Sequence, residues 1–251
     1  MLALLSPAKT LDYKRPLPEL SPTTPHFASE ALSIAAEAAK LSERDLARLM
    51  SISDSLAELN VERYRGFENL PERPALFAFA GDVYTGFEAR SLDEAAITFA
   101  QDHVRILSGL YGLLRPLDEI RPYRLEMGTR WAPHSGDLYA FWGSRIADLL
   151  AEDLTAQGSN VIVNLASKEY WGAVQKAPPA GADIYTIEFM ENGPAGLRFN
   201  SFGAKRARGM MARYICEHHL TDVEALKGFD SDGYAFDPAA SDERRWRFTR
   251  H

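Results

Sequence analysis

Polar residues that could carry out chemistry follow three short apolar runs of the chain. Lys9, Asp82 and Lys168 each lie a few residues beyond such a run. In an open α/β sheet, ligands bind beyond the carboxyl ends of the strands, so three neighbouring parallel strands would bring these side chains together. A lysine near other cations can act as a base or nucleophile, and a carboxylate can orient it. The three residues are therefore candidate catalytic residues. The alternative is that Lys9 and Asp82 form a structural ion pair.

The segment 103–124 contains a glycine-rich turn, from Ser108 to Gly112, between two stretches of helical character. It resembles the helix-hairpin-helix element of proteins that bind DNA without sequence specificity. There, glycines let the backbone approach a phosphate, and the N–H groups at the start of the second helix hold it. Two residues separate the glycines here where the usual hairpin has one, so a plain packing corner between helices is the alternative. The predicted DNA contacts of the segment are Arg105, Ser108, Gly109, Leu110, Gly112 and Arg115.

A basic helix is predicted from about Ala204 to His219. The stretch from Gly196 to Ile215 holds five basic residues and no acid, although the whole chain has a net charge of −7. Apolar residues fall on one face of this helix and cations on the opposite face. An unpaired basic face is typical of a phosphate-binding surface, and an ordinary solvated face is the alternative. The predicted DNA contacts on this helix are Lys205, Arg206, Arg208 and Arg213.

Other kinds of site are not indicated by the sequence. It contains no GxxxxGK[ST], GxGxxG, GxSxG or HExxH motif. Cys216 and His219 share a helix face but have no third ligand, which argues against a metal site. The single cysteine also excludes an internal disulfide and a dithiol redox switch. We therefore predict no metal and no cofactor, although an unidentified small-molecule ligand is compatible with the strand-end loops.

The composition is typical of a globular protein of one or two domains. The chain has 251 residues, of which 46% are hydrophobic and 25% charged. Its apolar start, Met1–Leu5, has no basic region before it and is too short for a signal peptide or a membrane span. We expect a cytoplasmic protein without membrane contact.

Elements that would position these candidates follow from the apolar periodicity and from the turn residues. Strands are predicted at Met1–Leu5, Ala75–Ala80, Val161–Ala166, Asp183–Phe189, Leu197–Phe202 and Arg245–Thr249. Helices are predicted within 28–60, from Ser91 to about Leu107, within Gly136–Gln157 and at the basic helix. Ser42-x-x-Asp45 and Ser91-x-x-Glu94 look like helix-capping boxes. Because strands and helices are interspersed, the sequence predicts a mixed α/β fold in a single compact domain over residues 1–251.

Five motifs, in order along the chain, resemble the YaaA family of peroxide stress proteins. They are SPAKTLD (6–12), GDVYTG (81–86), LSGLYGLLRPLD (107–118) with PYRLEMG (122–128), NLASKEY (164–170) and AKRARGMMAR (204–213). The resemblance runs from residue 1 to about 240. It implies a cytosolic protein that limits hydrogen peroxide damage by keeping unincorporated iron low. It also implies a fold of its own kind, with a helix-hairpin-helix element at Leu107–Arg115 and a basic cleft that binds DNA. The resemblance implies that the cleft is lined by Lys9, Arg124, Lys205, Arg206 and Arg208.

These observations favour a protein that protects against peroxide and binds duplex or branched DNA without strong sequence specificity. The alternative is an enzyme that acts on a small molecule or nucleobase at Lys9, Asp82 and Lys168. Direct iron storage is disfavoured because the sequence lacks Glu-x-x-His pairs on helices. We expect Lys9 to be partly enclosed and close to Asp82. We also expect the basic helix and the loop at 107–115 to face the same side.

Overall fold

Five parallel strands form the centre of the structure, a computed structural model that describes residues 1–19, 21–194 and 196–250. Across the sheet they are β3 (Val104–Ser108), β1 (Leu2–Leu5), β6 (Val161–Asn164), β7 (Asp183–Gly193) and β10 (Arg245–Arg250). Antiparallel strands flank them: β4 (Gly112–Leu114) beside β3, β9 (Tyr234–Phe236) beside β10, and β8 (Gly196–Arg198) beside the end of β7. The prediction of a mixed α/β fold is confirmed.

The sequences of β1 and β6 explain their place in the middle of the sheet. Both are continuous apolar runs, which is typical of parallel strands that are covered on both faces. All four residues of β1 are fully buried. The two strands are parallel neighbours in which Leu4 pairs with Asn164. Both strands were predicted from sequence, and both predictions are confirmed.

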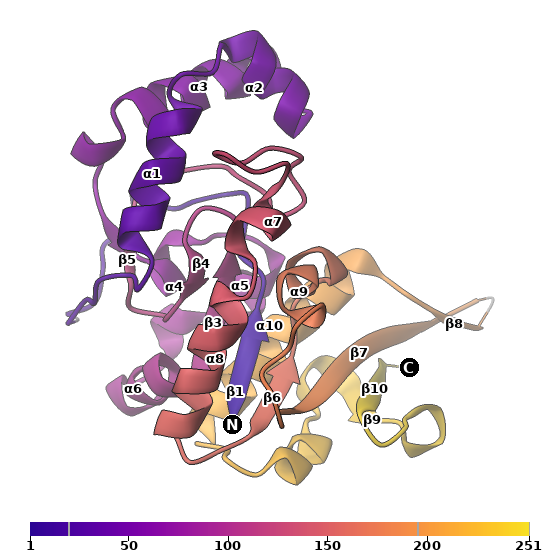
Figure 1. Ribbon diagram of the computed structural model, residues 1–251. Helices are drawn as coiled ribbons and strands as arrows, with labels where there is room; N and C mark the ends of the chain where they lie inside the picture. Colours follow the sequence, from indigo (N-terminus) through magenta and orange to yellow (C-terminus); the bar gives the residue numbers. More distant parts are fainter. Residues whose placement is uncertain (20, 195, 251) are drawn as a thin grey trace.

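Helices cover both faces of the sheet (Figure 1). One face carries α8 (Arg145–Ala156) and α9 (Lys168–Gln175), with the short α7 (Leu138–Trp142) against α9. The other face carries α6 (Glu94–His103) and α10 (Ser201–Glu217), with α5 (Asp82–Phe87) packed on α10. Two 3-10 helices, η3 (Val223–Gly228) and η4 (Ser231–Gly233), lead from α10 to β9. A third, η5 (Pro238–Ala240), lies between β9 and β10. The predicted helices within Gly136–Gln157 and at the basic helix are therefore present.

Two glycines hold α5 and α10 in direct backbone contact. A Cβ atom at Gly86 would lie 2.1 Å from the carbonyl oxygen of Arg206, and one at Gly209 would lie 1.8 Å from that of Val83. No side chain fits at either position unless the helices separate. This contact fixes where the cations of α10 lie relative to the loop before α5.

The first helices form a layer above the sheet in Figure 1. They are α1 (Ala28–Ala38), α2 (Glu43–Met50) and α3 (Asp54–Arg65), followed by the 3-10 helix η1 (Phe67–Asn69). The helices predicted within 28–60 are confirmed. Ser42 caps α2 by accepting the N–H of Asp45 at 3.1 Å. The hydroxyl of Tyr64 donates to the carbonyl of Arg124 and joins the layer to the body.

The strand predicted at Ala75–Ala80 is wrong. Arg73–Pro74 forms the short strand β2, which pairs with β5 (Glu119–Ile120), and Ala75–Ala78 is the helix α4. A short buried apolar run satisfies a strand and a helix equally well, and its alanines and leucine favour a helix. The loop expected at Gly81–Gly86 is likewise mostly the helix α5.

The helix predicted from Ser91 to Leu107 is shorter than expected. Ser91 ends the 3-10 helix η2 (Ala89–Ser91), and Asp93 caps α6 by accepting the N–H of Ala96 at 2.8 Å. The chain then enters β3 at Val104. β-Branched residues at Val104 and Ile106 favour a strand, and both are fully buried in the sheet.

The last part of β7 and the strand β8 extend away from the rest of the sheet (Figure 1). The strands predicted at Asp183–Phe189 and Leu197–Phe202 correspond to β7 and β8, which pair antiparallel. However, β7 continues to Gly193, and β8 covers only Gly196–Arg198. Gly196 has a φ of +98°, a conformation that favours glycine. The helix α10 then begins at Ser201, three residues after β8 ends.

Candidate functional site

The loops after β1 and β6 meet at the carboxyl edge of the sheet, as their parallel pairing requires. The N–H of Ser167 donates to the hydroxyl of Ser6 at 2.9 Å. The phenol of Tyr84, in α5, donates to the carbonyl of Ser6 at 3.0 Å. A Cβ atom at Gly81 would lie 3.1 Å from that of Ala8. Three of the motifs singled out in the sequence are thus in contact, although only two of them follow strands.

Lys9 does not lie where the sequence placed it. Its side chain is 65% exposed, and its ammonium lies 3.1 Å from the Glu126 carboxylate. No ion pair joins Lys9 to Asp82 among the described residues. Lys168 is the exposed first residue of α9. The expectation of a partly enclosed Lys9 is therefore wrong. The chain does bring Ala8 against Gly81, the neighbours of Lys9 and Asp82, but the ammonium of Lys9 pairs with Glu126.

Glu126 is the residue of this edge that sequence reasoning missed. It lies between the ammonium of Lys9 and the guanidinium of Arg124, each at 3.1 Å, and its side chain is only 14% exposed. Its Oε2 atom and the Nε atom of Arg124 are buried without a hydrogen-bond partner in the described chain. The motif PYRLEMG contains both residues, but nothing in its spacing pairs Glu126 with Lys9.

Buried phenols surround this carboxylate. Burial raises the pKa of Tyr64, Tyr123 and Tyr170, and the negative charge of Glu126 adds to the rise. The N–H of Gly128 donates to Glu169 at 3.0 Å and so joins the segment to α9. These contacts make a polar cluster (Lys9, Arg124, Glu126 and the three phenols) that could orient a proton-carrying or anionic group.

The predicted helix-hairpin-helix element is not formed at 107–115. The segment is an antiparallel pair, β3 and β4, in which Leu107 pairs with Leu113. Ser108 and Leu110 are fully buried. The carbonyl of Gly109 accepts the indole N–H of Trp142 at 3.0 Å. Gly112, at a φ of +67°, makes the turn. These backbone groups serve the core and are not accessible to a phosphate.

Arginines near this segment are also engaged within the protein. Arg105 is almost fully buried and lies 2.6 Å from Asp153. Arg115 holds Asp118 at 2.8 Å and caps the turn between them. Arg124 is paired with Glu126, so all three arginines have carboxylate partners within the protein. Arg105 and Arg124 are mostly buried, which argues against a contact with DNA. Arg115 is 40% exposed, and its assignment as a DNA contact stays a prediction.

The basic face of α10 is only partly open. Lys205 and Arg206 are exposed, and Arg206 lies 3.5 Å from Asp232. Arg208 is mostly buried; burial lowers its pKa, and its Nε atom has no hydrogen-bond partner in the described chain. Arg213 binds the carbonyl of Glu88 at 3.0 Å and the carboxylate of Glu217 at 2.6 Å. Two of the four predicted cations are therefore exposed, and one of them, Arg206, is paired with Asp232.

An exposed aromatic pair beside those cations was not expected. Phe199, just before α10, is 60% exposed, and Phe202, in the first turn of α10, is 73% exposed. The ammonium of Lys205 lies 6.0 Å from the ring centroid of Phe202. We call this set the aromatic–basic surface: Arg198, Phe199, Phe202, Lys205 and Arg206. The sequence contained a signal for this surface, because two phenylalanines stand among polar residues at the start of the basic helix.

Two acids border this surface: Asp232, which pairs with Arg206 at 3.5 Å and with Arg250 at 2.5 Å, and Glu191. Glu191 is buried and accepts hydrogen bonds from Asn200, Tyr234 and Arg250. These partners outweigh the effect of burial and lower the pKa of Glu191. The first turn of α10 carries no acid, and its backbone N–H groups add positive potential. The surface therefore favours a negatively charged partner.

The described part of the chain has neither a cluster of metal ligands nor a long apolar helix. No group of three or more His, Cys, Asp and Glu side chains is arranged there to hold a metal ion. None of its helices is both long and apolar enough to span a membrane.

Comparisons with known proteins give a consistent result. A family model described as "Peroxide stress protein YaaA" matches residues 1–240. A protein of Rhizorhabdus wittichii, named UPF0246 protein, is 67% identical over 251 residues, 100% of this chain and 99% of the relative. UPF0246 proteins of Polynucleobacter asymbioticus and Aliivibrio fischeri are 52% and 49% identical, each over 96% of this chain and 95% of the relative.

Proposed function

Because the chain belongs to the family of the peroxide stress protein YaaA, we propose that it acts in peroxide stress by binding DNA through the aromatic–basic surface. The observation that carries this proposal is the exposure of Phe199 and Phe202 beside three cations. Binding would be without strong sequence specificity, because base stacking and phosphate contacts do not read the edges of the bases.

The composition of the surface favours unpaired bases over a plain duplex. Aromatic side chains bind bases by stacking on their faces, and this is tolerant of sequence because every base has a π face. In a duplex those faces are covered by neighbouring base pairs. Arg198, Lys205 and Arg206 lie where they could follow the phosphates of the same strand. Single strands, and the open bases of branched DNA, are therefore the preferred ligands.

Charge decides between DNA and an apolar protein partner. Two exposed phenylalanines alone would also fit another protein. Here three cations accompany them in a chain whose net charge is −7, so the positive potential is local to this surface. The link to iron that the resemblance implies would be indirect: DNA held by the protein is shielded from radicals that iron and peroxide generate.

Fluorescence anisotropy with single-stranded, duplex and three-way-junction DNA of equal length tests the proposal. We expect the Phe199→Ala/Phe202→Ala variant to bind single strands at least about tenfold more weakly, since stacking contributes about 1–3 kcal/mol per base. Three phosphate contacts predict a log–log salt slope of roughly −2, which Lys205→Gln/Arg206→Gln should flatten. Leu59→Ala is the matched control, because Leu59 is 40% exposed on α3.

Unchanged affinity of the Phe199→Ala/Phe202→Ala variant for single strands would contradict the proposal. The proposal would also be contradicted if this variant lost self-association but bound DNA as tightly as the wild type. The surface would then be an interface between copies of the chain. Size-exclusion chromatography with light scattering on the same samples separates these results.

A second candidate function is an enzyme at the carboxyl edge of the sheet. The observation that favours it is the buried, unpartnered Oε2 atom of Glu126 next to Lys9 and Arg124. Lys9→Met tests it through DNA affinity in vitro and peroxide survival in cells. Lost survival with intact DNA affinity would favour chemistry at this cluster, and unchanged survival would discard Lys9 as a functional residue.

A further inference from the structure

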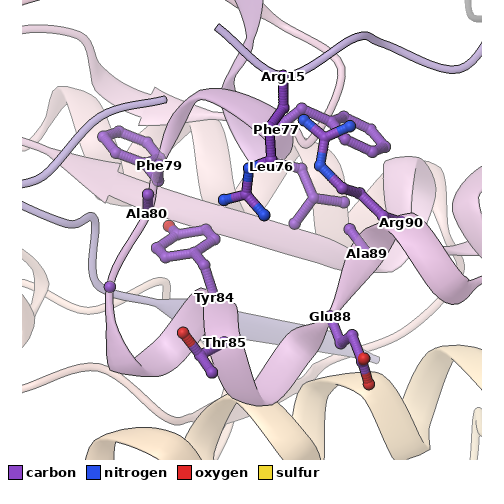
Figure 2. A pocket seen from close by; sticks show the side chains of 11 residues that line it. Arg15, Leu76, Phe77, Phe79, Ala80, Tyr84, Thr85, Glu88, Ala89 and Arg90 are labelled. Atoms are coloured by element: carbon purple, nitrogen blue, oxygen red, sulfur yellow. The ribbon is translucent and has the colours of Figure 1, made fainter. Parts of the chain in front are cut away.

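A pocket of about 360 Å³ lies between α5, the end of α4 and the segment that carries Arg15 (Figure 2). Phe77, Phe79 and Tyr84 form part of its wall, and Arg15 and Arg90 enter it from one side. In Figure 2 the Arg15 side chain reaches down into the pocket above Tyr84. The pocket has the size of a small-molecule site and is far too small for a DNA duplex.

Asp12 holds both guanidinium groups in place. Its carboxylate accepts the N–H groups of Lys14 and Arg15 at 3.0 and 3.1 Å. It also binds the Nε atom of Arg15 at 2.5 Å and lies 3.6 Å from Arg90. Burial alone would raise the pKa of Asp12, but these donors outweigh it and lower the pKa to about 2. The two arginines are thus oriented by one permanent carboxylate.

The pocket keeps an excess of positive charge. Nε of Arg15 is bound to Asp12, whereas its two terminal nitrogens have no partner among the described residues. Burial and the charge of Arg15 lower the pKa of Arg90. Glu88 is the acid in the pocket lining; it points away toward α10 in Figure 2 and lies 3.6 Å from Arg213. Asp12 offsets one of the two positive charges, and an anion bound at the terminal nitrogens of Arg15 would offset the other.

The remaining wall suits an apolar body with one polar contact. Phe77 and Phe79 are buried side chains that reach the pocket. The hydroxyl of Thr85 is exposed and has no hydrogen-bond partner in the described chain, so it can donate to a ligand. The hydroxyl of Tyr84 is already bound to Ser6. The lining thus has a cationic end, an aromatic wall and one free hydroxyl.

We propose that this pocket binds a small organic oxyanion, a phosphate monoester or a carboxylate with an apolar or aromatic body. The oxygens of the anion would accept paired hydrogen bonds from the terminal nitrogens of Arg15, a geometry in which guanidinium groups bind both kinds of anion. The apolar body would lie against Phe77 and Phe79. This site is separate from the aromatic–basic surface, and no residue belongs to both.

Isothermal titration calorimetry of the full chain tests the site with four probes. Phenyl phosphate and benzoate carry both features, inorganic phosphate lacks the apolar body, and benzyl alcohol lacks the charge. We expect one of the first two to bind more tightly than either of the last two. If phenyl phosphate binds more tightly, the natural ligands are phosphate monoesters; if benzoate binds more tightly, they are carboxylates.

Variants at Arg15 and Thr85 locate the binding. Arg15→Gln should weaken the best probe by about tenfold or more, as expected when charge-assisted hydrogen bonds are lost. Thr85→Val should weaken it by a smaller factor. Arg48→Gln is the matched control, because Arg48 is an exposed arginine paired with Asp45 on α2. Circular dichroism and the melting temperature show whether each variant is folded.

The proposal is overturned if no probe binds, if benzyl alcohol binds as well as the anions, or if Arg15→Gln and Arg48→Gln behave alike. It also predicts that Arg15→Gln keeps wild-type DNA affinity. Conversely, Phe199→Ala/Phe202→Ala should bind the small anion normally, so failure of one proposal is distinguishable from failure of the other.

Discussion

The ammonium of Lys9 lies 3.1 Å from Glu126, a carboxylate that Arg124 contacts at the same distance. This joins the loop after the first strand to a segment that follows β5, far along the chain. The two ion pairs differ in environment: the Lys9 side chain is 65% exposed and that of Arg124 is 17% exposed. They should therefore contribute unequally to stability.

Lys9→Met should change the free energy of unfolding by less than about 1 kcal/mol, since exposed ion pairs contribute little. Arg124→Met should cost at least about 2 kcal/mol because it removes the buried partner of Glu126. Urea denaturation of both variants measures the difference. Lys40→Met, which breaks an exposed pair with Glu37 on α1, is the control. Equal costs at Lys9 and Arg124 would contradict this description of the cluster.

Gly209→Ala and Gly86→Ala should each destabilise the protein by about 2 kcal/mol or more, because the added methyl group meets a backbone carbonyl of the facing helix. Thermal unfolding measures the change. Gly136→Ala is the control: its Cβ would meet nothing within 4 Å, so we expect a change within about 1 kcal/mol. A neutral Gly209→Ala variant would mean that α5 and α10 are not in backbone contact.

Cys216 should not react with peroxide or with thiol reagents in the folded protein. Its side chain is fully buried, and burial raises the pKa of the thiol, so almost no reactive thiolate forms at neutral pH. We expect Ellman's reagent to label it only after unfolding in guanidinium chloride. Rapid labelling of the native protein would instead indicate that the thiol is accessible and could react with peroxide.

Asp12 should make stability depend on pH in the acid range. Its pKa is lowered from 3.8 to about 2 in the folded protein. A lowered pKa stabilises the folded state at pH values above 3.8, and this contribution is lost as the pH falls from 3.8 toward 2. The difference in unfolding midpoint between wild type and Asp12→Asn should therefore shrink over this interval. If the difference between the two unfolding midpoints stayed constant down to about pH 2, ionisation of Asp12 would not contribute to stability.

Local patterns were enough to identify the elements whose residues have only one satisfactory environment. The apolar runs of β1 and β6 were predicted as buried strands, and both lie in the middle of the covered sheet. The basic helix was also predicted, because its apolar stripe has helical spacing. The sequence argument assumed that β1 and β6 are parallel neighbours, and the structure pairs them in this way and places Ser6 beside Ser167.

Elements whose sequences satisfy two environments were decided by tertiary packing. The run at Ala75–Ala78 is buried whether it is a helix or a strand, and the structure makes it a helix. The glycines at 109 and 112 suit a helix corner and a β-hairpin alike. Pairing of Leu107 with Leu113, and the indole of Trp142 bonded to Gly109, select the hairpin. The DNA-binding turn expected there is consequently buried.

Partners of charged side chains were decided entirely by the fold. Spacing along the chain suggested Asp82 for Lys9 and left the cations of α10 unpaired. The structure instead brings Glu126 to Lys9, and Glu88 and Asp232 to Arg213 and Arg206. An ion pair between distant segments leaves no periodic signal in the sequence, because it depends on how strands and helices are stacked and not on the residues between them.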